Sequence, residues 1–551
     1  MTNSRKAQLK TGNSRRILLL FAITAAAAML SLIGLSSLSY AEDAVNADGY
    51  IVTFSTEVTE SEAEAITDSE DVTMLTDDSA LVTDADPEAL EQDPDVDSVQ
   101  GNYVYNSGED EEEETPSADT MQNFMGKQWV FDYLDVPEAW NLLDKVAGSA
   151  DREPVRVAVL DTGAYYLHPD LKANMDIEHC VMIADGEAVP YDRSTLVSGH
   201  GTSISSIIGS TNNKFGVSGI AAGNHNNIVK IMAIDVFRGK YAGQYSATTA
   251  DCVAGIQYAV ENGAKVIQMC LGHDSSYVDY NGKRHNDKAL QDAIDEAAAN
   301  GCIVVCSAGN HRSTAAWYPS DLNNTISVIN LMKYKNAWTK SCKKRSSNYG
   351  KQKDVSSPGY NSYAANRAGG YSCVGGTSAA SAQCSAVVAM MCYVDPSLTY
   401  GSALNILATS CDDLFTKGKD AYTGWGKINA YSAVAMTAKR AGINGFASRL
   451  TPKTMKAPKL KAKAKNKRIR LKWSKVSGAN YYKVYRKVGS HGSYKCIKKT
   501  TSRTFVTKIK SKKKSVDYKV KAFGTTKDGK QNRSSYSNHV HVKTVKKKKK
   551  S

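Results

Sequence analysis

The chain has 551 residues, of which 42% are hydrophobic and 23% are charged. Its length excludes a protein with a single core, and its composition excludes disorder along most of the chain. The net charge of +13 is segregated: residues 42–115 contain 25 acidic residues and no Lys or Arg, whereas residues 449–551 contain 35 basic and two acidic residues. Such asymmetry predicts segments with separate roles.

The first 41 residues have the pattern of a secretory signal. Arg15 and Arg16 precede an apolar run over residues 17–35, and Ser39-Tyr40-Ala41 offers small residues at the cleavage positions. This pattern predicts export and removal of residues 1–41. An uncleaved membrane anchor is the alternative, because the run is close to the length that spans a bilayer.

Residues 42–108 predict a small α+β domain. Residues 49–55 are typical of a strand, residues 57–66 of a helix, and strand-like alternation returns over residues 96–105. Six adjacent carboxylates then occupy residues 109–114. Because these carboxylates repel one another, the stretch 109–120 is expected to be an exposed, easily cut linker.

From Val155 onward, short buried strands alternate with amphipathic helices. The strand patterns cover residues 155–160, 265–271 and 302–306, and the helical patterns cover residues 250–260 and 290–297. This alternation predicts an α/β domain over residues 121–445, with a parallel sheet covered by helices on both faces.

Beyond a basic linker over residues 446–462, the pattern changes to short alternating strands. They cover residues 469–473, 481–487 and 516–523. The pattern predicts an all-β sandwich over residues 463–545. Through Trp473, the run 482–486 and Ser537-Asn538, this segment resembles a fibronectin type III module. Residues 546–551 form a polybasic tail.

The eleven cysteines lie at irregular spacings and lack the density of a disulfide scaffold. Because their number is odd, at least one thiol is unpaired within the chain. Cys302 and Cys306 lie on one predicted strand and are expected to be small core residues.

The first motif with chemical content is Asp161-Thr162-Gly163, at the end of the first strand of the α/β domain. A carboxylate there projects at the carboxyl edge of the sheet, where the sites of α/β proteins gather. Pepsin-like proteases need a second such tripeptide to pair two carboxylates, and the sequence contains none. Alone, the motif is equally compatible with an Asp in a turn.

Two further motifs each begin a predicted helix. His200 lies between two glycines, which allow an imidazole to approach neighbouring groups in a cleft. Ser378 ends a Gly-Gly-Thr-Ser sequence before a long apolar run, where the N–H groups of a helix start favour an oxyanion. Alone, these motifs are also compatible with a structural histidine and a helix cap.

Taken together, Asp161, His200 and Ser378 occur in an order that resembles the catalytic triad of the subtilisin-like serine proteases, or subtilases. The resemblance runs from about residue 128 to residue 436. Further similar segments are residues 266–272, 304–310, 318–319, 357–359 and 424–430.

The resemblance implies a serine endopeptidase with a subtilisin-like fold. Ser378 would attack the scissile carbonyl, His200 would take and return the proton, and Asp161 would orient the imidazole. Asn310 would donate to the oxyanion. The family usually has Pro four residues after the nucleophile; Ala382 stands there, which removes no catalytic group.

The resemblance also implies a substrate-binding strand that contains Cys270, Leu271 and Gly272. His311 and Arg312 lie near the end of the family's main specificity pocket. Their positive or polarisable groups predict a preference for an acidic side chain in the substrate. The acidic linker would then supply a site for self-cleavage.

Residues 42–108 resemble a subtilase propeptide in segments 50–55 and 97–103, and are expected to be a foldable inhibitor of the chain's own active site. A disordered acidic leader is the alternative.

The resemblance implies protein substrates. No cofactor is required, because the sequence lacks His-Glu-x-x-His and a phosphate-binding loop. Metal ligands are unknown: subtilases often bind structural calcium, but spacing alone assigns no ligands here. No nucleotide is expected, and no membrane contact after signal cleavage.

The basic region from Arg449 onward predicts attraction to polyanions, and for an exported protein these include anionic cell-wall polymers. The protein is therefore expected to be secreted and to associate with the cell wall. A solvated spacer without a ligand is the alternative for this region. A second hypothesis for the whole chain is a catalytically inert surface-binding protein that uses the basic sandwich; the presence of all four candidate catalytic residues favours the active endopeptidase.

Overall fold

The computed structural model of the chain divides into two units, the second of which comprises mainly residues 442–551. The described residues are 49–107, 124, 127–147, 152–184, 186–191, 193–237, 239–241, 244–274, 287–331, 333–334, 337–338, 347–443, 457–465, 468–476, 479, 481–488, 494–508, 515–525, 531–534 and 536–542. The predicted signal 1–41, the acidic linker 109–120, most of the basic linker 446–462 and the tail 546–551 lie outside them.

The first unit contains an eight-stranded sheet with the order β19-β16-β14-β12-β6-β9-β7-β8. Neighbouring strands are parallel except for the β7–β8 hairpin at one edge. The predicted parallel sheet is thus confirmed, with one antiparallel edge strand added. The strands are β6 (Val155–Asp161), β7 (Val181–Ala184), β8 (Glu187–Pro190), β9 (Val229–Asp235), β12 (Val266–Met269), β14 (Ile303–Ser307), β16 (Thr325–Asn330) and β19 (Val355–Ser357).

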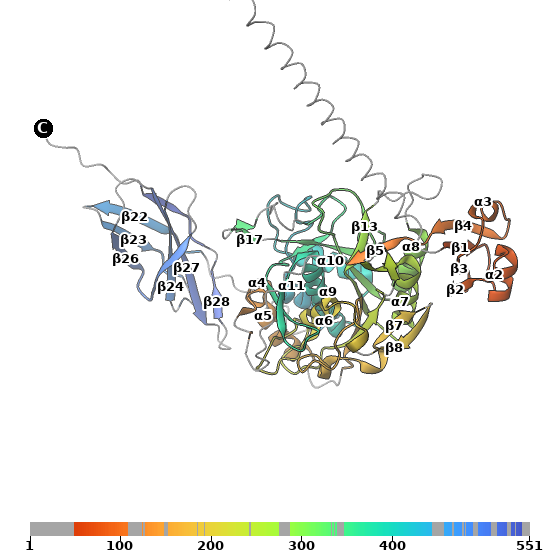
Figure 1. Cartoon of the computed structure of the whole chain (residues 1–551). Helices are drawn as coiled ribbons and strands as arrows, with labels where there is room; N and C mark the ends of the chain where they lie inside the picture. The colour runs from red at the N-terminus through yellow and green to blue at the C-terminus, as the bar shows by residue number, and fades with distance from the viewer. Residues whose placement is uncertain are drawn as a thin grey trace, which may run out of the picture. The chain divides into compact units, whose positions relative to one another are not determined.

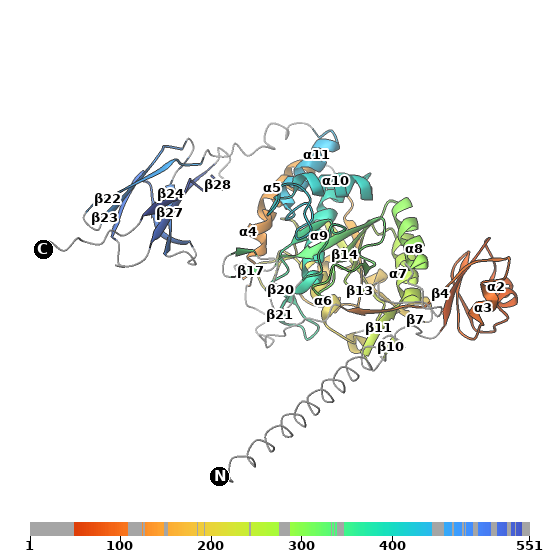
Figure 2. The ribbon, with the colours of Figure 1, turned by 90° about the horizontal axis from the view of Figure 1, so that it is seen from above.

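Helices cover both faces of this sheet, as predicted (Figure 2). Because side chains alternate along a strand, Ile267 and Met269 of β12 join the core under α7 (Thr249–Glu261) and α8 (Lys288–Ala299), while Gln268 bonds to α9 (Gly376–Val394) on the other face. The helix α6 (His200–Gly209) packs against α9. Further helices of this unit are α4 (Val130–Leu134), α5 (Val136–Ala147), α10 (Tyr400–Ser410) and α11 (Ala430–Arg440).

The helix α9 is the core helix of the first unit. It is long and apolar enough to cross a membrane, yet all of its 19 residues are buried within the protein. Its apolar character is therefore accounted for by packing. The helix runs without a break through Ala382, where the family usually has proline.

The N-terminal part of the first unit is a four-stranded antiparallel sheet with the order β2-β3-β1-β4 and two helices. One face buries Val52 and Phe54 beneath α2, and the other turns Ile51 and Leu75 toward α7 and α8. The strand and helix predicted over residues 49–66 are confirmed. The elements are β1 (Tyr50–Phe54), α2 (Glu60–Thr67), β2 (Val72–Thr76), β3 (Ser79–Val82), α3 (Pro87–Leu90) and β4 (Val96–Gly101).

A second sheet of this unit has the order β10-β11-β5-β13-β15. Its strands are β5 (Val104–Ser107), β10 (Gly239–Tyr241), β11 (Gln244–Thr248), β13 (Leu271–Asp274) and β15 (Trp317–Tyr318). Smaller elements are η2 (Lys172–Asn174), η3 (Ile177–His179), η4 (Arg193–Thr195), β17 (Lys333–Tyr334), β18 (Ala337–Trp338), β20 (Ser362–Ala365) and β21 (Tyr371–Val374).

The second unit has two antiparallel sheets around their own apolar core. One has the order β22-β23-β26, and the other has the order β25-β24-β27-β28 with β29 paired to β27. Trp473, Tyr482 and Tyr518 are buried between them. The strands are β22 (Leu460–Lys465), β23 (Arg468–Trp473), β24 (Tyr481–Val488), β25 (Lys495–Thr500), β26 (Thr504–Lys508), β27 (Val516–Thr525), β28 (Gln531–Arg533) and β29 (Val540–Val542).

Candidate active site

Asp161 is the last residue of β6, in the middle of the eight-stranded sheet. Its side chain is almost fully buried, and Oδ1 accepts a hydrogen bond of 2.8 Å from the N–H of Thr162. The all-buried strand carries the carboxylate to the carboxyl edge of the sheet, as the sequence predicts. There it becomes an acceptor held in a low-dielectric environment.

His200 begins α6 and points its Nδ1 at Asp161. Nδ1 lies 2.8 Å from Oδ1 and 2.9 Å from Oδ2 of that carboxylate. Since a carboxylate only accepts, Nδ1–H is the donor, and Nε2 of the neutral ring remains a base. Gly201 permits this approach, because a Cβ there would lie 2.1 Å from the carbonyl oxygen of Gly163.

Ser378 lies in the first turn of α9, where backbone N–H groups have no intrahelical partner. Its Oγ is buried and has no hydrogen-bond partner within the part of the chain that the structure describes. Buried hydroxyls rarely lack a partner, and such an exception calls for a chemical explanation. A reactive hydroxyl at the positive end of a helix dipole supplies one.

Asn310 follows β14 and reaches the same helix terminus. Its Oδ1 accepts from the N–H of Thr377 at 3.0 Å and from the hydroxyl of Thr377 at 3.1 Å. These bonds leave Nδ2 as a buried donor without a partner among the described residues. Gly376, with a φ of +78°, brings the backbone close, since a Cβ there would lie 3.2 Å from Nδ2. An unpaired amide donor beside a hydroxyl is what a developing oxyanion requires.

Cys270 contacts the first turn of α9 beside Ser378. Its thiol is 3.6 Å from the carbonyl oxygen of Ser378 and 3.4 Å from the hydroxyl of Ser381, and it accepts from Nε2 of Gln268. Burial raises the pKa of the Cys270 thiol, with Asp161 adding to the effect, so the thiol stays protonated. Cys270 is therefore a supporting residue and not a competing nucleophile.

A strand of the N-terminal segment lies beside these groups. β5 lies next to β13 (Figure 1) and pairs antiparallel with both β11 and β13. Tyr105 faces Ala247 across one pair, and Asn106 faces Gly272 across the other. Because Cys270 directly precedes β13, the chain of β5 runs toward Ser378. Leu271 and Gly272 thus pair with an extended segment, which is the way a sheet edge binds a peptide.

Two amide side chains of the same segment cap the helices behind it. Oδ1 of Asn102 accepts from the N–H of Ala250 in α7 at 3.1 Å, and Oε1 of Gln100 accepts from the N–H of Ala289 in α8 at 2.9 Å. Both N–H groups lack intrahelical acceptors because they lie in a first turn. Sequence reasoning missed these caps, since an amide residue near a strand gives no sign of its partner.

Asp287 is a fully buried carboxylate that joins the segment to the helices. It accepts from the N–H of Leu290 at 3.0 Å, from Nε2 of Gln100 at 2.9 Å, from Oγ1 of Thr249 at 2.6 Å and from the hydroxyl of Tyr105. Burial raises the pKa of Tyr105 well above its ordinary value, and the negative charge of Asp287 adds to this, so the phenol remains a donor. The one sequence signal for Asp287 was an acidic residue directly before an amphipathic helix.

His311 and Arg312 lie on an exposed loop directly after Asn310. The imidazole of His311 is 4.7 Å from the ring of Trp317, which is itself buried. Arg312 has a φ of +58° and is exposed. Both residues therefore lie near Asn310 in the chain and are exposed, and His311 lies on the solvent side of Trp317.

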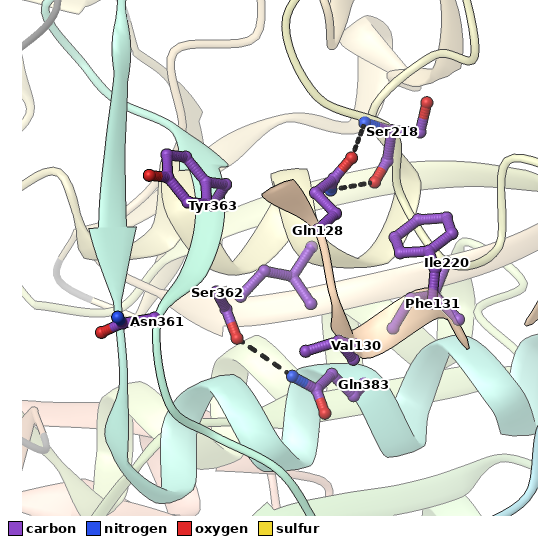
Figure 3. Close-up of a pocket in the computed structure, with 10 residues that line it drawn as sticks. Gln128, Val130, Phe131, Ser218, Ile220, Asn361, Ser362, Tyr363 and Gln383 are labelled. Atoms are coloured by element: carbon purple, nitrogen blue, oxygen red, sulfur yellow. Dashed lines mark hydrogen bonds between the residues drawn. The ribbon is translucent and has the colours of Figure 1, made fainter. Parts of the chain in front are cut away.

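The hollow in Figure 3 is separate from this site. It has a volume of ≈ 20 Å³, which suits about one water molecule. Gln128 at its wall is already bonded through both ends of its amide to the backbone of Ser218. This hollow is a packing gap. Within the described ranges, no three side chains of His, Cys, Asp or Glu gather as a metal site.

Comparisons with known proteins point to one protein family. The model of the subtilase family matches residues 152–426. Subtilisin DY of Bacillus licheniformis is 30% identical over 283 residues, which cover 51% of this chain and 90% of that protein. Thermitase of Thermoactinomyces vulgaris is 27% identical over 314 residues, which cover 56% of this chain and 97% of that protein.

Among solved structures, this chain is similar to fervidolysin from Fervidobacterium pennivorans, described as a keratinolytic enzyme related to subtilisin. The TM-score is 0.57 at 18% identity, with 89% of this chain and 74% of that chain covered. At this identity, the match shows a common fold.

Proposed function

Because this chain belongs to the subtilase family and is a serine endopeptidase, we propose that it cleaves proteins through Asp161, His200 and Ser378. The observation that carries the proposal is the bond of His200 Nδ1 to both carboxylate oxygens of Asp161. This bond fixes the ring and its tautomer at the start of α6, which packs against α9, the helix that contains Ser378.

In the proposed reaction, Nε2 of His200 removes the proton from the hydroxyl of Ser378 as Oγ attacks the scissile carbonyl. The imidazolium that forms is stabilised by Asp161 and returns the proton to the leaving amine. Nδ2 of Asn310 and the N–H groups at the start of α9 donate hydrogen bonds to the carbonyl oxygen as it gains negative charge. Water then attacks the acyl-enzyme while Nε2 of His200 removes its proton. His200 returns this proton to Oγ of Ser378 as the carboxylic acid leaves.

Residues 42–108 are proposed to inhibit the protease until they are cut away. β5 occupies the edge of β13, and the side chains of Gln100 and Asn102 cap α8 and α7. These contacts support a complex in which an inhibitor fills the peptide-binding groove and is held by a second surface. Addition of separately made residues 42–108 to the processed enzyme tests this, and an absence of inhibition at micromolar concentration counts against it.

Cys270, Leu271 and Gly272 are proposed to bind substrate, the last two by strand pairing. His311 and Arg312 are proposed to favour acidic side chains, because their exposed positive or polarisable groups follow the oxyanion donor. The acidic linker 109–120 offers such residues directly after the inhibitory segment.

Secretion through residues 1–41 and retention at an anionic cell surface complete the proposal. Retention is supported by the basic residues of the second unit, which are exposed on both of its sheets, among them Lys461, Arg470, Lys495 and Lys499. No cofactor is needed for this chemistry, and any structural calcium stays unassigned.

A serine-directed fluorophosphonate tests the central proposal. Labelling of the processed chain at Ser378, and loss of labelling in Ser378→Ala, is the expected result. An unlabelled processed chain would favour the catalytically inert surface-binding protein instead. Labelling of another serine would contradict the assigned nucleophile.

A further inference from the structure

Tyr105 occupies a pocket that is built for its whole side chain. The residue is fully buried, its ring lies 4.7 Å from that of His273, and its hydroxyl donates to Asp287. The walls come from β11 and β13 on either side of β5, and the polar floor comes from the starts of α7 and α8. Such a combination of apolar walls and one placed acceptor specifies a ligand.

The acceptor at the floor persists when the N-terminal segment leaves. Asp287 then loses the donors from Gln100 and Tyr105 but keeps the hydroxyl of Thr249 and the N–H of Leu290. As the N-cap of α8 it stays fixed in position. The vacated pocket therefore presents Oδ2 of Asp287, which keeps the hydroxyl of Thr249 as a donor but has lost that of Tyr105, at the end of an apolar slot. A ligand hydroxyl that donates to Oδ2 replaces the lost hydrogen bond.

The strand register relates this pocket to the bond that is cut. Asn106 faces Gly272 and Ser107 faces Leu271, so the next residue of a peptide in this position comes beside Cys270. The thiol of Cys270 is 3.6 Å from the carbonyl oxygen of Ser378. In the proposed complex, the residue beside Cys270 therefore supplies the scissile carbonyl, and the side chain at the position of Tyr105 lies three residues before it.

We infer that the processed enzyme selects tyrosine three residues before the residue that supplies the scissile carbonyl, through the hydroxyl acceptor Asp287. This inference rests on the proposed function, since it places the substrate where β5 lies. Phenylalanine fits the same walls but donates nothing to Oδ2 of Asp287, which is then left with the hydroxyl of Thr249 alone. Sites that bind a substrate hydroxyl reject the analogue that lacks it far more strongly than apolar pockets reject a change of size.

A separate observation concerns the residue that supplies the scissile carbonyl. The indole of Trp317 fills the space between Gly272 on β13 and Gly309 after β14. A Cβ at Gly272 would lie 2.1 Å from Nε1 of Trp317, and a Cβ at Gly309 would lie 2.8 Å from its Cδ2. The imidazole of His311 lies 4.7 Å from the indole on the solvent side.

The geometry points to Trp317 as the residue that closes the side-chain pocket next to Asn310. A substrate side chain at that point meets the indole, so glycine is accepted there and large side chains are excluded. The preference for acidic side chains proposed for His311 and Arg312 then applies outside this pocket, because both residues are exposed to solvent. In the chain's own sequence, the residue three positions after Tyr105 is Gly108, and the acidic linker follows it. The segment 105–108 thus has both features that the two pockets select.

Both inferences are tested with fluorogenic peptides of the sequence of residues 104–112 and the processed enzyme from the full chain. For the tyrosine pocket, kcat/KM is compared between this peptide and its Tyr105→Phe analogue. We expect a ratio of about 10 or more in the unaltered enzyme. In Asp287→Ser, whose side chain still caps α8 but does not reach a phenol, we expect the ratio to fall to about 1.

The control for that arm is Asp292→Ser, on the exposed side of the same helix, which should keep the unaltered ratio. Because each ratio is taken within one enzyme, a general loss of activity cancels. Equal cleavage of the tyrosine and phenylalanine peptides by the unaltered enzyme would overturn the inference. Failure to cleave any peptide, together with no fluorophosphonate labelling, would overturn the proposed function itself.

For Trp317, the second comparison is with the Gly108→Phe analogue. The unaltered enzyme should cleave the glycine peptide at least about 10-fold better, and Trp317→Gly should lower that ratio at least about 10-fold by opening the pocket. Trp317→Phe, which leaves the space mostly filled, is the matched control. A phenylalanine peptide cleaved as well as the glycine peptide by the unaltered enzyme would contradict the assignment.

Discussion

The side-chain oxygen of Asn310 accepts both the N–H and the hydroxyl of Thr377, the residue directly before Ser378. These two hydrogen bonds occupy the oxygen of the amide and leave Nδ2 as the donor for the proposed oxyanion. Thr377 and Ser378, neighbours at the start of α9, thus position the proposed oxyanion donor and the proposed nucleophile.

The variants Ser378→Ala and Asn310→Ala should differ in their residual activity. Loss of the nucleophile should abolish peptide hydrolysis, whereas loss of the oxyanion donor should lower kcat by about 10²–10³ and leave KM nearly unchanged. Steady-state kinetics on a cleavable peptide measure both. Full activity of Ser378→Ala would refute the mechanism.

Thr377→Val should produce a smaller loss than Asn310→Ala, because it removes one of the two bonds that orient the amide. We expect a fall of kcat by about 10-fold, with no change in the yield of fluorophosphonate labelling at completion. Thr377→Ser, which retains the hydroxyl, should restore kcat. A Val variant as fast as the unaltered enzyme would show that the backbone bond alone orients Asn310.

Binding of the inhibitory segment should weaken at alkaline pH. The docked phenol of Tyr105 has a higher pKa than a free phenol, whose ordinary value is 10.0, because of burial and the nearby Asp287 and Cys252. Docking is therefore fully favourable below pH 10 and loses affinity as pH rises above it. Inhibition constants of residues 42–108 measured from pH 8 to pH 11 should rise above pH 10, and Tyr105→Phe should bind more weakly at pH 8 without that rise.

Removal of one partner from the buried ion pair of Lys353 and Asp321 should lower the stability of the protein strongly. Nζ of Lys353 lies 2.7 Å from Oδ1 of Asp321. Burial lowers the pKa of Lys353, and Asp321 opposes this shift. In an inactive Ser378→Ala background, Lys353→Met should lower the free energy of unfolding by about 3 kcal/mol, because Asp321 is left buried without its partner.

Addition of Asp321→Asn to Lys353→Met should recover part of the lost free energy of unfolding. The matched control is Lys419→Met, whose pair with Asp354 is partly exposed and should be worth less than about 1 kcal/mol. Denaturant unfolding measures all four chains. Equal losses for the two lysine variants would contradict the role given to burial.

Retention by the second unit should depend steeply on salt. The Ser378→Ala chain should bind anionic bacterial walls at low ionic strength and be released at 1 M salt, where the Debye length is about 3 Å. The same chain without residues 449–551 should not bind. Binding that is unchanged at 1 M salt would rule out electrostatic anchoring.

The proposed catalytic groups could be identified from sequence because each lies in a short motif with its own local geometry. Asp161 ends an apolar strand, and His200 and Ser378 begin apolar helices flanked by glycine. The alternation of strands with helices along the chain likewise predicted the parallel sheet and the helices on both of its faces. The β7–β8 hairpin did not follow, since an edge strand carries a weaker apolar pattern.

The two proposed specificity pockets could not be predicted in this way. Tyr105, Thr249 and Asp287 are brought together from three distant segments, and none of them is unusual in its own surroundings. Trp317 precedes a recognised Tyr-Pro pair, but its placement between Gly272 and Gly309 depends on tertiary packing. Such contacts become visible only when the strands are placed side by side.

Departure of β5 leaves β11 and β13 with facing unpaired edges. A polypeptide can fill that gap only by supplying its own N–H and C=O groups from both sides over several consecutive residues, which a helix or a tightly packed loop does not offer. Proteins that are unfolded, or that have long loose tails, are therefore the vulnerable ones. A compact protein, including another copy of this enzyme, is then expected to be spared by its folded state.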